Sequence, residues 1–241
     1  MKRNDCLERM KPAEIIFDSG EQLAQQLAQS IADDLREAVA ARGTASLVVS
    51  GGRTPAQMFA VLARQPLAWD KIWITLSDER WVSASHPDSN QAMVQRTLLQ
   101  HGASAAHFVP LKNSAETAGQ GAAESAKAVA AMPRPFDVVV LGMGDDGHFA
   151  SLFPLAPQLA AGLDLTNRQL CIAVDPVSAP HARMSLTLAA LLASRRIVIQ
   201  LSGTTKLKVI HRALQNGAVE ELPIRAILHQ AQTLVEIYWS D

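Results

Sequence analysis

The sequence has few cysteines and no clustered positive charge. Only two cysteines, Cys6 and Cys171, occur among its 241 residues, far apart and without metal-ligand spacing. This pattern excludes a disulfide framework and a cysteine-based zinc site, and it predicts a protein of the reducing cytoplasm. Lysines and arginines are scattered and the formal net charge is -1. We therefore expect no nucleic-acid partner, because that footprint needs clustered basic residues.

Long hydrophobic runs are also missing. No segment reaches membrane-spanning length, and the opening residues 1–10 carry positive charges without the apolar stretch of a secretory signal. We expect neither membrane association nor export. Residues 1–12 are predicted to be a poorly ordered tail before a strand-like run, with Met10 as an alternative start. No long Pro/Gly/Ser linker divides the chain, so residues 1–241 are predicted to form a single domain.

Apolar runs alternate with helix-like stretches along the chain. A helical stripe over 21–42 ends at Gly43, and the Ala-rich segment 113–131 is predicted to be a crossover helix. The strand-like runs are 14–17, 45–49, 72–76, 136–141, 170–174, 197–201 and 234–238. Such alternation predicts an α/β protein, a Rossmann-like three-layer α/β/α fold with a mostly parallel central sheet. Ligands of such folds bind beyond the carboxyl ends of the strands.

The first polar cluster, 50–55, follows the run 45–49 and precedes a helix-like stretch. Gly51 and Gly52 would let backbone amides approach an anion, Thr54 would cap the helix, and Pro55 suits the first helical position. A phosphate cradle is one interpretation, and an ordinary capped turn is the other. The P-loop spacing GxxxxGK[ST] is absent.

The second cluster, Ser-Asp-Glu-Arg-Trp over 77–81, follows the run 72–76. Arg80 would clamp a phosphate, while Asp78 or Glu79 would meet sugar hydroxyls or hold Arg80 in place. The alternative is a solvated surface turn with a local ion pair. The sequence does not decide which of the two carboxylates faces a ligand.

The third cluster is a glycine-rich turn with two aspartates and a histidine after the run 136–141. Asp146 and His148 are close enough for the carboxylate to accept the imidazole N–H and so orient a general base. A histidine that caps a turn is the alternative. The segment 142–147 also satisfies GxGxxG, but it lies past mid-chain and a proline follows it at Pro154, which argues against dinucleotide binding.

Two further cations come late in the chain. Arg183 lies in 180–187, and Lys206 lies in the first turn of a helix that is predicted after Gly203. A lysine there opposes the helix dipole unless an anion is bound. We therefore interpret Lys206 as an anion-binding residue, with a solvated lysine as the alternative.

Taken together and in this order, these motifs resemble the 6-phosphogluconolactonase family over nearly the whole chain. The resembling segments are 50–55, 77–82, 89–90, 141–154, 183–187 and 202–206. The one visible departure is Arg53, where the family more often has Ser, so the role of Arg53 stays open. The resemblance implies a hydrolase that opens 6-phospho-D-glucono-1,5-lactone in the oxidative pentose phosphate pathway.

Glucosamine-6-phosphate deaminases are the nearest rival, because they share the fold and similar turns. Where this chain has the glycine-rich turn of the third cluster, deaminases have a sequence similar to Asp-Gly-His-Ile-Ala-Phe-Asn-Glu. The glutamate of that sequence aligns with Phe153 here. Their Asp-Glu-Tyr is here Asp-Glu-Arg, which ends at Arg80. Both differences favour the lactonase family.

The lactonase resemblance implies His148 as general base, held by Asp146, and no metal or redox cofactor. The implied substrate-binding residues are Gly51, Gly52, Thr54, Asp78, Arg80, Arg183 and Lys206. The partner is expected to be a small sugar phosphate, and the protein a monomer or weak homodimer. The alternatives are a deaminase-like enzyme and a sugar-phosphate binding protein without activity.

Overall fold

The computed structural model describes residues 12–241. The predicted tail over 1–12 thus lies, apart from Pro12, outside the described residues. Seven strands form a central sheet in the order β1-β10-β9-β6-β2-β3-β5, and every pairing in it is parallel. Their bounds are β1 Ala13–Phe17, β2 Ala45–Val49, β3 Ile72–Leu76, β5 His107–Val109, β6 Phe136–Leu141, β9 Ser194–Ser202 and β10 Leu234–Ser240.

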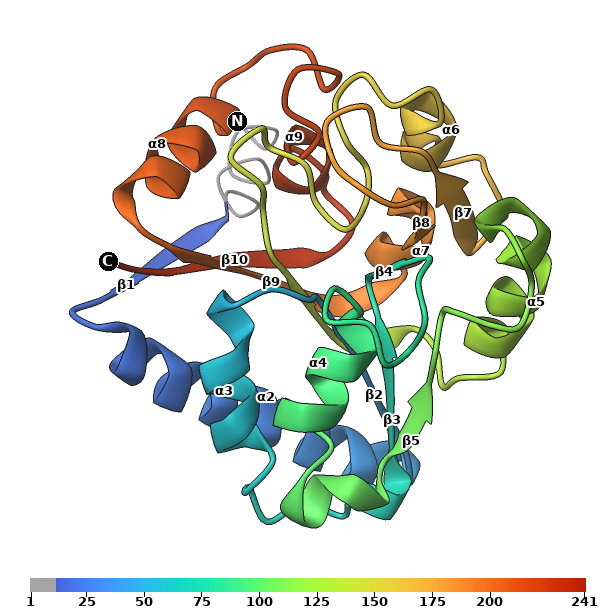
Figure 1. The fold of residues 1–241 in the computed structure, drawn as a ribbon. Coiled ribbons are helices and arrows are strands. Elements are labelled where there is room, and N and C mark those ends of the chain that lie inside the picture. The colour runs from blue at the N-terminus through green and yellow to red at the C-terminus, as the bar shows by residue number, and fades with distance from the viewer. Residues whose placement is uncertain (1–11) are drawn as a thin grey trace, which may run out of the picture.

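Helices cover both faces of this sheet, which confirms the predicted three-layer fold (Figure 1). They are α2 Gly20–Arg42, α3 Thr54–Leu62, α4 Asn90–Thr97, α5 Ala118–Ala130, α6 Leu159–Leu163, α7 Leu188–Leu192, α8 Thr204–Ala213 and α9 Arg225–Leu228. Two 3-10 turns, η1 Trp69–Lys71 and η2 His101–Ala105, flank β3 and β5. Within residues 12–241, none of the helices has the length and apolar character that a bilayer crossing needs.

The long helix α2 follows directly from its sequence. The Ser19 side chain accepts a hydrogen bond from the Gln22 amide at 3.2 Å and begins the helix. Gly43 ends it in the left-handed conformation, φ 78°. Between them the predicted apolar stripe is buried, including Leu23, Leu27, Ile31 and Leu35. The segment 113–131 is helical only as α5, because Thr117 forms a capping box with Gln120 and so begins the helix there.

A second, antiparallel sheet lies beside the first, in the order β4-β8-β7. Its strands are β4 Asp78–Arg80, β8 Arg183–Leu186 and β7 Cys171–Val174. The interpretation of the run 170–174 as part of the parallel sheet was therefore wrong. Four apolar residues fit either sheet, and the run itself does not encode the antiparallel pairing with β8 that follows the loop 175–182.

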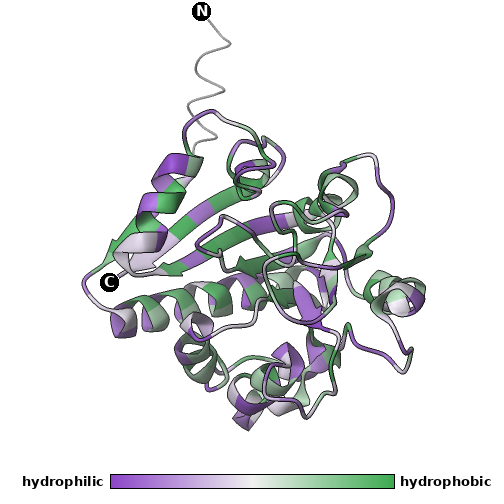
Figure 2. Cartoon of the chain, turned by 45° about the horizontal axis from the view of Figure 1, so that its top comes forward, coloured by the Kyte–Doolittle hydropathy of each residue, from purple (hydrophilic) through white to green (hydrophobic). Residues whose placement is uncertain are grey.

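The core lies on both sides of the central strands. All residues of β2 and of β6 are buried, as continuous apolar strands between two helical layers must be. Figure 2 shows these central strands mostly in the hydrophobic colour, with hydrophilic residues toward the outside. Cys171 belongs to this interior, and burial raises the pKa of its thiol to about 12, so it is an inert core residue.

Candidate active site

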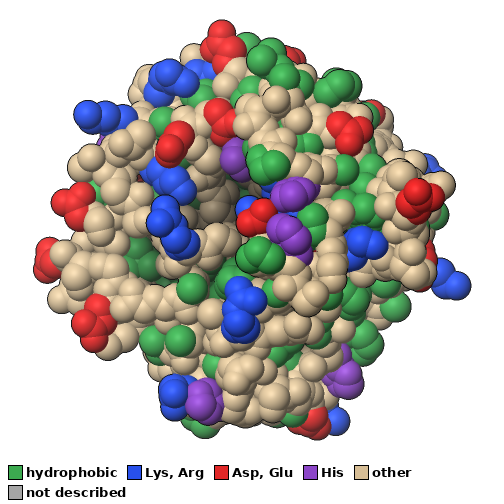
Figure 3. Space-filling model, in the orientation of Figure 1, with side chains coloured by type: hydrophobic (Ala, Val, Ile, Leu, Met, Phe, Trp, Pro, Cys, Tyr) green, Lys and Arg blue, Asp and Glu red, His purple; other side chains and the backbone are tan. Residues whose placement is uncertain are grey.

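A cleft of about 640 Å³ opens at the carboxyl ends of β2, β3, β6 and β9. Figure 3 shows this hollow with basic side chains at its margin and histidine and acidic side chains beside it. Of the nine residues predicted from the sequence, eight line it: Gly51, Gly52, Thr54, Asp78, Arg80, His148, Arg183 and Lys206. The ninth, Asp146, contacts the cleft residue His148.

The Asp146–His148 pair has the predicted geometry. Nδ1 of His148 lies 2.6 Å from Oδ1 of Asp146, and because a carboxylate only accepts, Nδ1 carries the proton. This leaves the lone pair on Nε2 for a proton from another molecule. Partial burial acts to raise the pKa of Asp146, but the hydrogen bond and charge of His148 outweigh it and hold that pKa below its ordinary value. Asp146 therefore stays ionised and fixes one tautomer.

The turn that carries this pair depends on a glycine. The Gly144 amide donates to the His148 carbonyl at 2.9 Å, and the Gly147 amide donates to the Gly144 carbonyl at 3.0 Å. A Cβ on Gly144 would lie 2.2 Å from Nδ1 of His148, well inside contact distance. The glycine-rich sequence thus permits the close approach of backbone and imidazole.

Phe153 packs against the imidazole of His148. Its ring is stacked on that of His148 with centroids 3.9 Å apart and an angle of 27° between planes. The guanidinium of Arg183 lies 5.7 Å from the Phe153 centroid. The position that aligns with the glutamate of the deaminases is therefore occupied here by an aromatic ring that contacts both the histidine and a cation.

The two carboxylates of β4 have different surroundings. Glu79 is buried and accepts hydrogen bonds from the Arg80, Asn90 and Gln91 amides and from the Ser89 hydroxyl. These bonds anchor the first turn of α4. Desolvation raises the pKa of Glu79, and the amide hydrogen bonds oppose that shift. Glu79 therefore has a structural role and does not line the cleft.

Asp78 lines the cleft instead. Its Oδ2 accepts a hydrogen bond from the Ser151 hydroxyl at 2.6 Å. Its Oδ1 accepts from the Ser77 hydroxyl at 3.2 Å and from the side-chain amide of Asn90 at 3.4 Å. The alternative of a solvated surface turn was wrong, since Asp78 and Glu79 are both buried. Sequence alone gave no sign of this because the strand that covers them, β8, begins about a hundred residues later.

Replacement of Glu79 by alanine is expected to destabilise the fold. Three backbone amides and a hydroxyl would lose their acceptor in a buried site, so we expect the free energy of unfolding to fall by about 3 kcal/mol or more. Urea denaturation measures this. Glu124→Ala, on the exposed side of α5, is the matched control and should leave the midpoint unchanged. Equal midpoints for both variants would contradict the capping role.

Two arginines meet on the small sheet. Arg80 and Arg183 are directly paired in the antiparallel register of β4 and β8. Arg183 is only 5% exposed; desolvation lowers its pKa most, Asp78 acts to raise it, and Arg80 lowers it further. Nε of Arg80 is buried and lacks a hydrogen-bond partner among the described residues. Like charges this close are costly unless an anion joins them, which favours an anion-binding site.

Across the cleft, two strand-to-helix turns contribute. Lys206 lies in the first turn of α8, which begins after Gly203 without a side-chain cap. Gly51 approaches Asn90 so closely that a Cβ on Gly51 would lie 1.8 Å from Oδ1 of Asn90.

Thr54 is the first residue of α3. Its hydroxyl lies 3.2 Å from that of Ser202, and its side chain makes no capping hydrogen bond to the helix. The prediction that Thr54 caps this helix was therefore wrong, and Pro55 is its second residue.

Sequence reasoning missed several cleft residues. Gln200 of β9 is 5% exposed and its buried Oε1 lacks a partner among the described residues. His86, Asp88 and His181 gather at the mouth of the cleft, with Nε2 of His181 2.9 Å and Nδ1 of His86 4.0 Å from Oδ2 of Asp88. The hydrogen bond from His181 lowers the pKa of Asp88. Ninety-three residues separate Asp88 from His181, so no local pattern indicates this cluster.

Fold and site together define an α/β protein with a cleft lined by cations and an oriented histidine at the carboxyl edge of its sheet. Residues 18–239 match the family model described as glucosamine-6-phosphate isomerases/6-phosphogluconolactonase. The chain therefore belongs to this family, as its motifs predicted.

Two relatives and a solved structure are similar to this chain over most of its length. A 6-phosphogluconolactonase of Pseudomonas putida is 44% identical over 217 residues, 90% of this chain and 88% of the relative. That of Mesorhizobium japonicum is 45% identical over 224 residues, 93% of each chain. The crystal structure of a 6-phosphogluconolactonase from Shewanella baltica superposes with a TM-score of 0.94 at 47% identity, covering 96% of this chain and 98% of the other.

Proposed function

We propose that the protein hydrolyses 6-phospho-D-glucono-1,5-lactone to 6-phospho-D-gluconate, a step of the oxidative pentose phosphate pathway. One observation carries the proposal: the oriented His148 shares a cleft with the paired Arg80 and Arg183. Relatives at 44% and 45% identity that bear the name 6-phosphogluconolactonase support it. The enzyme would act in the cytoplasm, as a monomer or weak homodimer.

His148 is the general base of the proposed mechanism. Nε2 removes a proton from water as the water oxygen bonds to C1 of the lactone. The tetrahedral intermediate then breaks the bond between C1 and the ring oxygen, and the proton passes from Nε2 to that oxygen. Asp146 stabilises the imidazolium that exists between these steps, because its carboxylate lies 2.6 Å from Nδ1 and stays ionised.

The phosphate is the proposed handle of the substrate. Arg80 and Arg183 approach it from the small sheet, Lys206 from α8, and the amides around Gly51 and Gly52 from the turn after β2. Thr54 and Asp78 are proposed to contact the substrate through hydrogen bonds. Binding of the remote dianion would position C1 against His148, so binding energy would be used for orientation.

The deaminase alternative is disfavoured by a contact. Phe153 stacks on His148 where that reaction would place a carboxylate in a proton relay, and a phenyl ring transfers no proton. A sugar-phosphate binding protein without activity is disfavoured by the His148–Asp146 bond, because binding alone needs no general base with a fixed tautomer.

The test is the disappearance of freshly prepared 6-phosphoglucono-1,5-lactone at neutral pH, followed against its spontaneous hydrolysis. We expect the wild-type protein to accelerate the loss by orders of magnitude. An absence of acceleration would overturn the proposal. Release of ammonia from glucosamine 6-phosphate would then test the deaminase alternative in the same preparation.

A further inference from the structure

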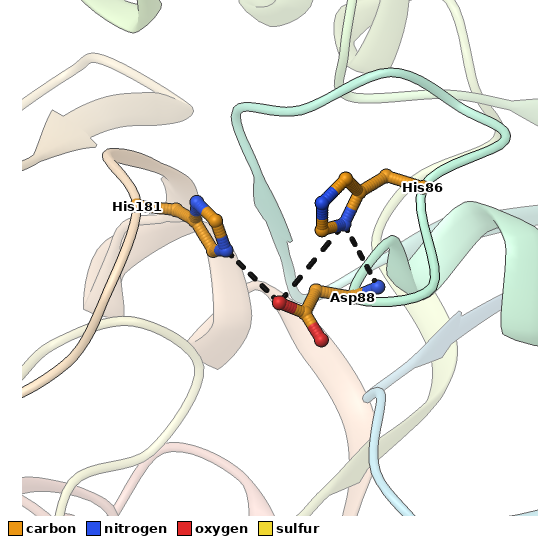
Figure 4. Close-up of side chains that lie close together, drawn as sticks. All are labelled: His86, Asp88 and His181. Atoms are coloured by element: carbon orange, nitrogen blue, oxygen red, sulfur yellow. Dashed lines mark hydrogen bonds and ion pairs between the residues drawn. The ribbon is translucent and has the colours of Figure 1, made fainter.

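Three potential metal ligands converge at the mouth of the cleft, outside the proposed lactonase machinery. His86 and Asp88 come from the loop between β4 and α4, and His181 from the loop between β7 and β8. Figure 4 shows the Asp88 carboxylate between the two loops, with one imidazole on its left and the other on its right. The ring centroids are 5.4 Å apart at 76°, with one histidine edge toward the other ring. We propose that His86, Asp88 and His181 form a binding site for a divalent transition-metal ion of the zinc class.

The donor set fits such an ion. Two imidazole nitrogens and one carboxylate oxygen are common protein ligands of zinc in sites that keep a fourth position for water or substrate. Hard cations such as Mg²⁺ and Ca²⁺ prefer all-oxygen sites, so they are poor candidates.

The spacing also fits, with small side-chain adjustments. Ligand atoms of a tetrahedral zinc site with bonds near 2.0 Å lie about 3.3 Å apart. Here Nε2 of His181 is 2.9 Å and Nδ1 of His86 is 4.0 Å from Oδ2 of Asp88, and all three atoms lie within 4.8 Å of one another. Nδ1 of His86 accepts from the Asp88 amide at 3.1 Å, a bond in an accessible loop that water can replace.

The position of the site suggests how it couples to the cleft. Asp88 and His181 line the cleft, so the open coordination position of a bound ion would face it. The ion would link the loop between β4 and α4 to the loop between β7 and β8. The first of these loops contacts the arginine pair, because Nη1 of Arg80 donates to the Asp88 carbonyl. That nearby guanidinium opposes a second cation, so we expect micromolar rather than nanomolar affinity.

A Zn²⁺ titration in competition with a chromogenic chelator tests the proposal on the tag-free full chain. It uses a Cys6→Ser background, because Cys6 is a rival thiolate ligand, whereas the thiol of Cys171 is buried. We expect one ion per chain, with at least about 10-fold weaker binding in His86→Ala, Asp88→Asn and His181→Asn. Asparagine replaces His181 because φ there is 69°, which asparagine tolerates.

His211→Ala is the matched control, because His211 also pairs with a carboxylate, Glu14 at 2.9 Å, but belongs to no cluster of three potential ligands among residues 12–241. Its affinity should equal that of the parent. Zinc should also raise the melting temperature of the parent and not of the three variants, whose metal-free melting shows whether they fold. Co²⁺ should give a tetrahedral visible spectrum in the parent only.

Three outcomes would overturn the proposal. The first is no stoichiometric binding by the parent. The second is unchanged affinity in folded His86 and His181 variants. The third is loss of binding in His148→Ala alone, which would place the ion at the His148–Asp146 pair instead.

Discussion

Replacing His148 by alanine is expected to lower kcat for the phosphorylated lactone by about 10²- to 10⁴-fold, the usual contribution of a general base. The imidazole lines the cleft and is held in one tautomer by the 2.6 Å contact of Nδ1 with Asp146, so Nε2 can accept a proton. KM should change little, because the cations that are proposed to bind the phosphate are untouched. Initial rates, corrected for spontaneous hydrolysis, measure the effect.

Two further variants sharpen this result. Asp146→Asn keeps the shape but removes the charge that stabilises the imidazolium, so kcat should fall by an intermediate amount. His107→Ala, far from the cleft on β5, is the control and should retain full turnover. Near-normal kcat in folded His148→Ala would refute the mechanism while leaving lactone hydrolysis itself intact.

Much of the fold could be predicted from sequence because its main signals are local. Continuous apolar runs predict β2, β3 and β6, and the stripe ended by Gly43 predicts α2. The strands β4, β5 and β8 have only three or four residues, too few for any periodicity. Their positions come from pairing with other segments of the chain, and β7 belongs to the second sheet through its antiparallel pairing with the next strand, β8.

The candidate site likewise has features that a local motif predicts and features that depend on distant segments. The Asp146–His148 pair and the glycine turns are encoded within a few residues, so the motif predicts their geometry. The distinct roles of Asp78 and Glu79 depend on α4 and on Ser151, and the pairing of Arg80 with Arg183 depends on the register of the small sheet. Such relations arise only once the chain is folded.

The small sheet explains why the substrate should need its phosphate. It pairs Arg80 with Arg183, whose pKa is lowered by desolvation and by the charge of Arg80, and Lys206 lines the same cleft. Hydrogen bonds between charged groups contribute about 1.5–3 kcal/mol each, so three such contacts amount to roughly 10³-fold or more. We therefore expect kcat/KM for D-glucono-1,5-lactone, which lacks the phosphate, to be at least about 10³-fold lower.

A substrate-by-variant comparison isolates this phosphate contribution. Arg183→Ala and Lys206→Ala should each lower kcat/KM for the phosphorylated lactone by about 10- to 100-fold, mainly through KM, and leave the slow reaction of the unphosphorylated lactone nearly unchanged. Lys208→Ala is the matched control, because Lys208 lies on the same helix but is exposed and outside the cleft. Equal losses on both substrates would mean that the cations support the fold or the reacting carbon, and would contradict their assignment to the phosphate.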